Sequence, residues 1–189
     1  IQKMLDNLDS FSEDEVMEID RLVDELSTRK QNQLSYDDLI EFCKAMMPDF
    51  IVGKHHRILA DLLMEIESGV KDRACVNIPP RHGKSQLVSI FFPAWYLGRN
   101  PNDLAVDFGR KVRNLISTPE YLAIFPTVKL ASDSKSAGRW NTSVGGEYYA
   151  CGVGSALAGR GADLLLVDDP HSEQDVINGN FAVFEKAYE

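Results

Sequence analysis

Two short segments of the chain carry side chains that could bind and activate a phosphate group. The first, Asn77–Gln86, reads NIPPRHGKSQ and lies between an expected strand and an expected helix. Backbone N–H groups in such a turn, together with the N-terminus of the following helix, favour a bound anion. Gly83 lets the backbone approach the phosphates because it has no Cβ atom. Lys84 would then reach the β- and γ-phosphates, and the hydroxyl of Ser85 would bind Mg²⁺.

This segment departs from the complete phosphate-binding motif at the motif's first position. The pattern Gly-x4-Gly-Lys-Ser/Thr requires a glycine where this chain has Ile78. A bare Gly-Lys-Ser is common by chance, so the interpretation depends on the strand–turn–helix context. The alternative is an ordinary tight turn with a surface lysine. The residues expected to bind the nucleotide are Pro80, Arg81, His82, Gly83, Lys84, Ser85 and Gln86.

The second segment is a run of four apolar residues, Leu164–Val167, followed by Asp168 and Asp169. Such a run predicts a strand that is buried on both faces, with the acids at its carboxyl end, where open α/β sheets bind ligands. Asp168 would hold Mg²⁺, because a hard cation prefers oxygen ligands. Asp169 would orient the attacking water. The alternative is a strand followed by a turn that binds no metal.

A glycine-rich loop, Gly152–Gly161, precedes this second segment and contains Arg160. The glycines favour a tightly turning loop. A positive charge here could reach a γ-phosphate in its own subunit or in a neighbouring one. Such an arginine finger contributes about 10³–10⁵ in rate. The alternative is a surface arginine in a loop.

Two further groups of residues have both a structural and a functional interpretation. His55 and His56 are adjacent and point in different directions on a helix, so no zinc spacing results. They are interpreted as a pair at a helix start, with the alternative that one of them, or Arg57, flanks an adenine. The basic run Arg110–Arg113 is interpreted as a solvated helix face, with polynucleotide phosphates as the alternative.

Three aromatic side chains between residues 140 and 149 raise the same choice. Trp140, Tyr148 and Tyr149 could stack on nucleic-acid bases. A half-buried strand explains the two tyrosines equally well.

The elements that must position these residues alternate between strands and helices. Expected strands are Arg73–Ile78, Glu147–Cys151 and Leu164–Val167. Expected helices are His56–Glu67, a helix after the turn through Leu87, Ile90, Phe91 and Trp95, Leu104–Ile116, and one that starts at Thr118-Pro119-Glu120. This alternation predicts an α/β fold with a mostly parallel sheet flanked by helices.

The N-terminal quarter differs from the remainder in charge. Residues 1–50 hold 13 acidic and 5 basic side chains, out of a net charge of −9 for all 189 residues. A boundary is therefore expected near Pro48, with an acidic helical segment at residues 1–48 and the main domain at 49–189. Ser12 and Glu15 predict a capping box, and Ser35 predicts the start of a second helix. The segment is interpreted as a helical appendage with a solvated acidic face, and a partner-docking arm is the alternative.

Composition excludes several protein classes. The acidic balance argues against a freestanding basic nucleic-acid module. No run of about 18 apolar residues is present, and no basic region followed by an apolar run precedes the first helix, so neither a membrane span nor a secretory signal is expected. The three cysteines lie far apart and form no metal-binding pair, which favours a reducing, cytoplasmic setting.

Taken in order, the motifs resemble the N-terminal ATPase domain of the large terminase subunit of tailed bacteriophages. The resemblance covers most of residues 50–175. The stretches that carry it are His55–Arg57, Pro79–Ser85, Phe92–Pro101, Asp103–Arg113, Gly145–Tyr149 and Gly159–Pro170.

This resemblance implies a P-loop NTPase that binds ATP and Mg²⁺ and acts as a viral DNA-packaging motor. Several copies would form a ring on the portal protein of a procapsid, work with the small terminase subunit, and push double-stranded DNA inward. Lys84 would bind ATP, Asp168 would serve Mg²⁺, the acid at Asp169 would activate water, and Arg160 would act across the subunit interface.

The chain departs from the family pattern at three places. Asp169 stands where many relatives have a longer glutamate, so Glu173 or a water is the alternative general base. Between Asn102 and Asp103, a strand that relatives carry is not evident. The chain also stops before the family's coupling motif and its C-terminal nuclease domain, so no nuclease activity is expected from these residues. Another P-loop ATPase of helicase or recombination type, or a non-catalytic interaction module, remains the alternative function.

Overall fold

Helices make up more than half of the structure. The computed structural model describes residues 12–79, 81–101, 104–106, 109–132, 134, 136, 138–150, 162–168 and 177–179. The longer helices are α2 (Glu13–Asp37), α3 (Leu39–Met46), α4 (Lys54–Glu67), α6 (Phe92–Arg99), α7 (Gly109–Leu115) and α8 (Pro119–Ile124). The short helix α5 (Lys84–Gln86) continues through the π-helical η2 (Leu87–Phe91) directly into α6.

The strands within the described residues are short. They are β1 (Leu104–Val106), β2 (Arg139–Asn141), β3 (Glu147–Tyr149) and β4 (Leu164–Leu165), and they lie in the order β2-β3-β1-β4. The strands β2 and β3 pair antiparallel over their full length. The contacts of β1 with β3 and with β4 run parallel but extend over only two residue pairs each.

The expected α/β architecture, with a mostly parallel sheet flanked by helices, is therefore wrong: the structure is mostly helical, and its one full-length strand pairing is antiparallel. Residues 73–78 form no strand, because their backbone does not pair with any of the described strands, although the side chains of Val76 and Ile78 pack against the core. The segment expected to be one helix, Leu104–Ile116, divides into β1 and α7. The run Leu164–Val167 was expected to be a strand buried on both faces. It is not buried on both faces, since Leu165 and Val167 are 59% and 52% exposed.

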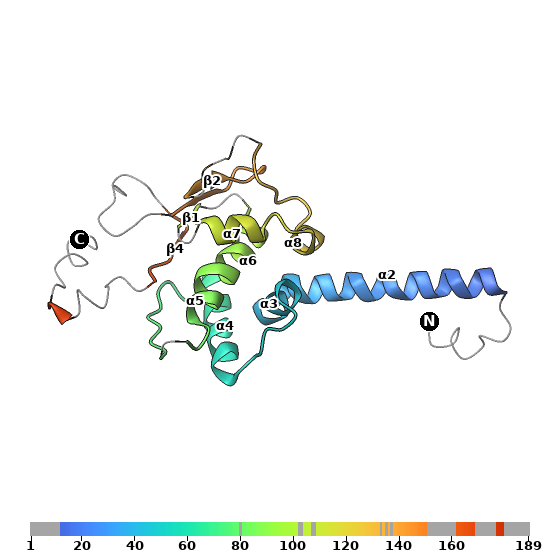
Figure 1. The fold of residues 1–189 in the computed structure, drawn as a ribbon, viewed down its shortest axis with the longest axis horizontal. Helices are drawn as coiled ribbons and strands as arrows, with labels where there is room; N and C mark the ends of the chain where they lie inside the picture. Colours follow the sequence, from blue (N-terminus) through green and yellow to red (C-terminus); the bar gives the residue numbers. More distant parts are fainter. Residues whose placement is uncertain are drawn as a thin grey trace.

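The hydrophobic core gathers around η2 and α6. Buried side chains from α3, α4, α7 and α8 surround these two helices, among them Phe42, Leu59 and Tyr121. The helix α3 precedes the boundary expected near Pro48, yet all its buried residues belong to this same core. Figure 1 shows the helices grouped at the centre, with the strands on one side of them.

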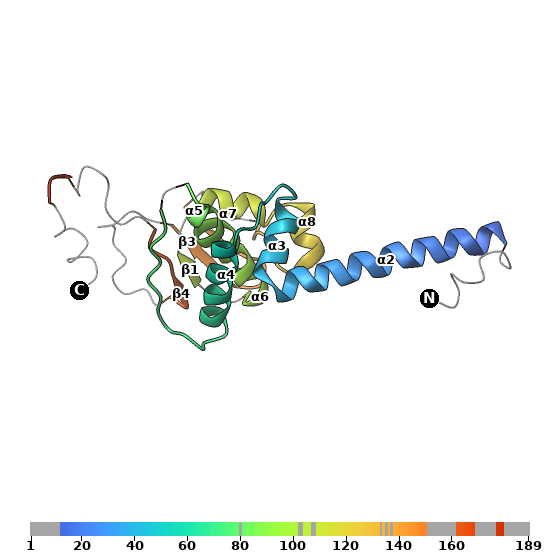
Figure 2. The same ribbon diagram turned by 90° about the horizontal axis from the view of Figure 1, so that it is seen from below.

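The first part of α2 extends away from this group of helices in both Figure 1 and Figure 2. Its N-terminus carries the expected capping box: the backbone N–H of Ser12 donates to Glu15 Oε2 at 2.8 Å, and the backbone N–H of Glu15 donates to Ser12 Oγ at 3.4 Å. We call the exposed part, Glu13–Arg29, the arm. None of the described helices combines the length and apolar character that crossing a bilayer requires.

The N-cap of α3 is Asp38 and not Ser35, which the sequence had predicted. Ser35 lies inside α2, where it is buried and its hydroxyl donates to the carbonyl of Glu41. The cap of α3 is Asp38, whose Oδ1 accepts from the backbone N–H groups of Ile40 and Glu41 at 2.8 and 3.0 Å. Because aspartate binds free N–H groups at a helix start as well as serine does, the sequence alone left the choice open.

Candidate phosphate-binding site

The two segments with expected phosphate chemistry meet in the folded chain. Lys84, at the start of α5, places its Nζ atom 3.1 Å from Asp168 Oδ1, just after β4. The Asp168 side chain is almost completely buried there, and that of Lys84 is largely buried. The structure thus brings together the lysine and the aspartate that the sequence predicted to share one site.

Asp168 also binds two hydroxyl groups of the helix that follows the turn. Ser89 Oγ donates to Asp168 Oδ2 at 2.8 Å, and the Ser85 side chain makes a further hydrogen bond to the same carboxylate. Burial by itself raises the pKa of Asp168, but the hydrogen bonds from Ser85, Ser89 and Lys84 and the lysine charge outweigh it. The net pKa lies below the ordinary aspartate value, so Asp168 is an anion at neutral pH.

Sequence reasoning missed Ser89. It is fully buried in η2, four residues after Ser85, so both hydroxyls lie on the same side of the helix. That spacing was visible in the sequence, but serine is common in helices and nothing marked this one. The π-helical turn at Leu87–Phe91 is of a kind that often occurs at functional sites.

The turn before Lys84 adopts backbone conformations that suit glycine. We call Arg81–Gly83 the phosphate turn. Arg81 has φ 65°, and Gly83 has φ 76° and ψ 6°, both in the left-handed region. A Cβ atom on Gly83 would lie 2.6 Å from His56 Nε2. Glycine is thus required at position 83 for two reasons, its left-handed backbone and the nearby His56 ring. The sequence argument had named only the approach of a phosphate.

His56 and His55 lie behind the phosphate turn, on the first turn of α4. His56 Nε2 is 3.0 Å, and His55 Nε2 is 3.2 Å, from the carbonyl oxygen of His82. The residue His56 is only 8% exposed, and its ring lies against the ring of Phe50, with ring centroids 5.1 Å apart. This position leaves no face of His56 open to stack on an adenine.

The oxygen atoms at this site fit a magnesium ion. Magnesium in nucleotide sites takes one or two protein oxygens and completes its octahedron with phosphate oxygens and waters. Ser85 and Asp168 supply a hydroxyl and a carboxylate that already contact each other. Among the described residues, no group of three His, Cys, Asp or Glu side chains is placed to hold a metal ion by itself.

Several predicted site residues cannot be compared with the geometry. Pro80, Arg160, Asp169 and Glu173 lie outside the described residues. Arg81 and His82 are exposed in the phosphate turn, and Gln86 is half-buried at the end of α5.

The side chains considered for nucleic-acid contacts divide into two groups. Trp140 and Tyr148 are buried and stack on each other across β2 and β3 at a ring separation of 4.6 Å, so they belong to the core and cannot stack on bases. Arg110 and Lys111 on α7 are exposed, which agrees with the interpretation of a solvated helix face.

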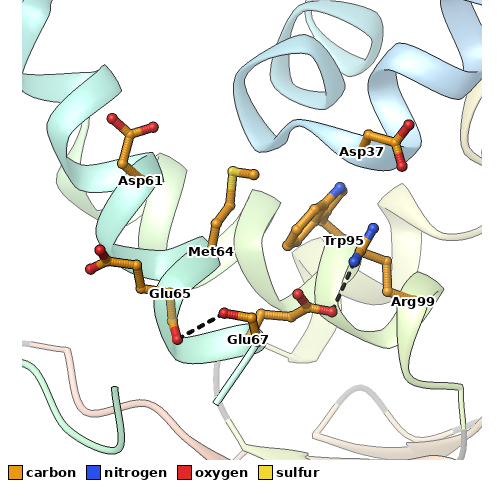
Figure 3. Close-up of a pocket in the computed structure, with 8 residues that line it drawn as sticks. Asp37, Asp61, Met64, Glu65, Glu67, Trp95 and Arg99 are labelled. Carbon is orange, nitrogen blue, oxygen red and sulfur yellow. Dashed lines mark hydrogen bonds and ion pairs between the residues drawn. The ribbon is translucent and has the colours of Figure 1, made fainter. Parts of the chain in front are cut away.

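A second concave region lies at the C-terminal half of α4 and is shown in Figure 3. It encloses about 350 Å³ and is lined by Asp37, Asp61, Met64, Glu65, Glu67, Ser68, Trp95 and Arg99. Arg99 is already paired there: its Nε atom is 2.8 Å from Glu67 Oε1, and its guanidinium lies over the rings of Tyr36 and Trp95. This region is a structural junction between α2, α4 and α6, and it lacks the phosphate-binding groups of the first site.

Comparisons with protein families, with curated proteins and with solved structures found no match to this chain. The resemblance to large terminase subunits therefore remains a prediction that depends on the motifs alone.

Proposed function

We propose that this chain binds a nucleoside triphosphate with Mg²⁺ at the phosphate turn and hydrolyses it. The observation that carries the proposal is the contact between Lys84 and Asp168, at 3.1 Å, beside a turn whose backbone is left-handed at Gly83. A lysine, a hydroxyl and a carboxylate at the start of one helix are the groups that such a substrate requires. The proposal concerns the site and does not depend on a large parallel sheet.

Each group would have a separate task when the nucleotide is bound. Lys84 would exchange its contact with Asp168 for contacts with the β- and γ-phosphate oxygens. Ser85 and Asp168 would hold the Mg²⁺, which would neutralise the charge that develops on the transferred phosphoryl group. Ser89 would keep the Asp168 carboxylate in place through its 2.8 Å hydrogen bond. Asp169 or Glu173 would orient the water, and Arg160 would add positive charge.

The motif order supports a more specific setting, that of a large terminase ATPase. In this setting the chain would act in the cytoplasm of an infected bacterium, in a ring on the procapsid portal, and would use ATP to move double-stranded DNA. The test is stimulation of hydrolysis by portal and duplex DNA together. Stimulation by single strands alone would favour a helicase or recombination ATPase instead.

The nucleotide site can be tested by calorimetric titration with Mg²⁺ and a non-hydrolysable ATP analogue. Replacing Lys84 by alanine removes hydrogen bonds to a charged group, each worth about 1.5–3 kcal/mol, so affinity should fall at least about tenfold. Lys71→Ala is the matched control, because Lys71 pairs with Glu65 away from the site. Equal affinities of the wild type and Lys84→Ala would disprove the assignment.

A non-catalytic interaction module is the second candidate, and the arm favours it. The arm exposes apolar side chains, including Met17, Leu22 and Leu26, without a covering element among the described residues. This candidate predicts that no Mg²⁺-dependent nucleotide binding is detected in the same titration. Binding that depends on Lys84 would exclude it as the sole function.

A further inference from the structure

We infer that His56 is a positioning residue that holds the phosphate turn in its binding conformation through contacts with His82 and Gly83. The inference rests on the proposed function, because it assigns a role toward the same nucleotide site. It replaces the alternative in which this histidine flanks an adenine, since the ring is buried and both of its nitrogens face backbone groups.

The first step is the pair of hydrogen bonds that the His56 ring makes. The backbone N–H of Gly53 donates to His56 Nδ1 at 3.0 Å, so Nδ1 must carry a lone pair. In the neutral ring the hydrogen then lies on Nε2, which is 3.0 Å from the carbonyl oxygen of His82 and 3.1 Å from His55 Nε2. The ring therefore connects the start of α4 to the phosphate turn, 26 residues later in the chain.

The second step is the fit between this ring and Gly83. The ring lies so close to Gly83 that an added Cβ atom would be 2.6 Å from Nε2. Gly83 is the N-cap of α5, and its carbonyl accepts the first helical hydrogen bond, from the backbone N–H of Leu87 at 3.0 Å. Movement of the ring would therefore release both His82 and Gly83, whose backbone must point correctly for Lys84 to reach a phosphate.

The third step concerns protonation, which links the ring to pH. A second proton on the ring would place a hydrogen on Nδ1 and oppose the Gly53 N–H group. Burial lowers the pKa of His56, the nearby His55 lowers it further, and hydrogen bonds to the His82 and Ile51 backbones oppose these effects. Among the described residues, His55 in α4 and His82 in the phosphate turn are the titratable groups that face the ring.

The experiment compares three variants of the full chain. His56→Gln keeps an amide that can reach the His82 carbonyl. His56→Asn can accept from the Gly53 N–H but is too short to reach His82, and His56→Ala keeps neither contact. We expect His56→Ala to raise the Kd for the Mg²⁺–ATP analogue about tenfold to a hundredfold, since displacements near 1 Å have effects of this size. His56→Gln should restore affinity to within about threefold, and His56→Asn should not. Ile58→Ala, at an exposed position of the same helix, is the control.

A purely structural role is distinguished by two additional readouts. The affinity of the wild type should decrease as the pH falls through the lowered pKa of His56, and this decrease should be smaller in His56→Gln. Amide hydrogen exchange without nucleotide should become faster at Leu87 in His56→Ala and slower again in His56→Gln. Equal affinity and equal exchange in all folded variants would overturn the inference, and so would equal behaviour of Gln and Asn.

The proposed function can fail separately from this inference. If the wild type binds no nucleotide, the proposed function is wrong, and the exchange at Leu87 still decides whether His56 holds the turn. If the wild type binds nucleotide in a Lys84-dependent way but the His56 variants match it, only the present inference is wrong.

Discussion

The arm and the phosphate turn differ in how far along the chain their stabilising partners lie. In the arm, Arg21 pairs with Glu18 and Arg29 pairs with Glu25, each within one helical turn. At the phosphate turn, Asp168 is held by Ser89 from 79 residues away, and His82 is held by His56 from 26 residues away.

This difference has consequences for stability and for prediction. Contacts within one turn of a helix can break without disturbing the rest of the molecule, so the arm should open locally. Contacts between distant segments are lost only when those segments separate. The phosphate turn should therefore depend on the packed core formed from α3 onward, which we call the body. The same distinction explains why residue spacing in the sequence predicted the capping box but did not predict the roles of Ser89 and His56.

The strongest test of this comparison applies one substitution to the packed core that supports the phosphate turn and one to the arm. Leu39 is fully buried in α3, and its replacement by alanine should cost about 2–5 kcal/mol through lost contacts and a cavity. Leu26 in the arm is 47% exposed, so Leu26→Ala should change the free energy of unfolding by less than about 0.5 kcal/mol. Urea unfolding measures both. Similar costs at the two sites would contradict the separation of arm and body.

A second test uses two glycines with nearly the same backbone conformation. Gly83 and Gly69 have φ of 76° and 74°, but a Cβ atom would meet His56 only at Gly83 and nothing within 4 Å at Gly69. Gly69→Ala should cost about 1–2 kcal/mol from the left-handed backbone alone. Gly83→Ala should cost more and should also weaken nucleotide binding. Equal costs, measured by thermal unfolding, would show that the His56 contact is unimportant.

A third test uses pH at the buried carboxylate. The pKa of Asp168 is lowered in the folded protein, so its stabilising effect is complete above the ordinary aspartate pKa of about 3.9. This stabilisation is lost as the pH falls through the lowered value. The difference in unfolding free energy between the wild type and Asp168→Asn should therefore be largest near neutral pH and shrink in acid. A difference that does not change with pH would contradict the charge network around Asp168.

The smallest effect is expected at the start of the arm. Ser12→Ala removes one side of the capping box, which stabilises a helix end by about 1 kcal/mol. Because the arm opens locally, amide exchange should become faster over the first turns of α2, while the melting temperature of the body should stay constant. A lower melting temperature of the body would mean that the arm and the body unfold together.

Local signals in the sequence predicted several elements correctly. The Thr118-Pro119 start of α8 and the Ser12–Glu15 box are both present, because caps depend on residues three or four positions apart. The turn before Lys84 and the helix after it were also predicted. The strand at residues 73–78 was wrong, and the helix over Leu104–Ile116 is present only from Gly109, because a short apolar run takes the conformation that its neighbours allow.

By itself, the sequence determined where α2 and α8 begin and which residue types could bind a phosphate, since both depend on chemistry between near neighbours. Only the tertiary structure decided that the sheet is small, that α3 belongs to the core, and that His56 and Ser89 support Lys84 and Asp168. The physical reason is that pairing of distant segments depends on how all helices pack together, and no local pattern encodes that packing.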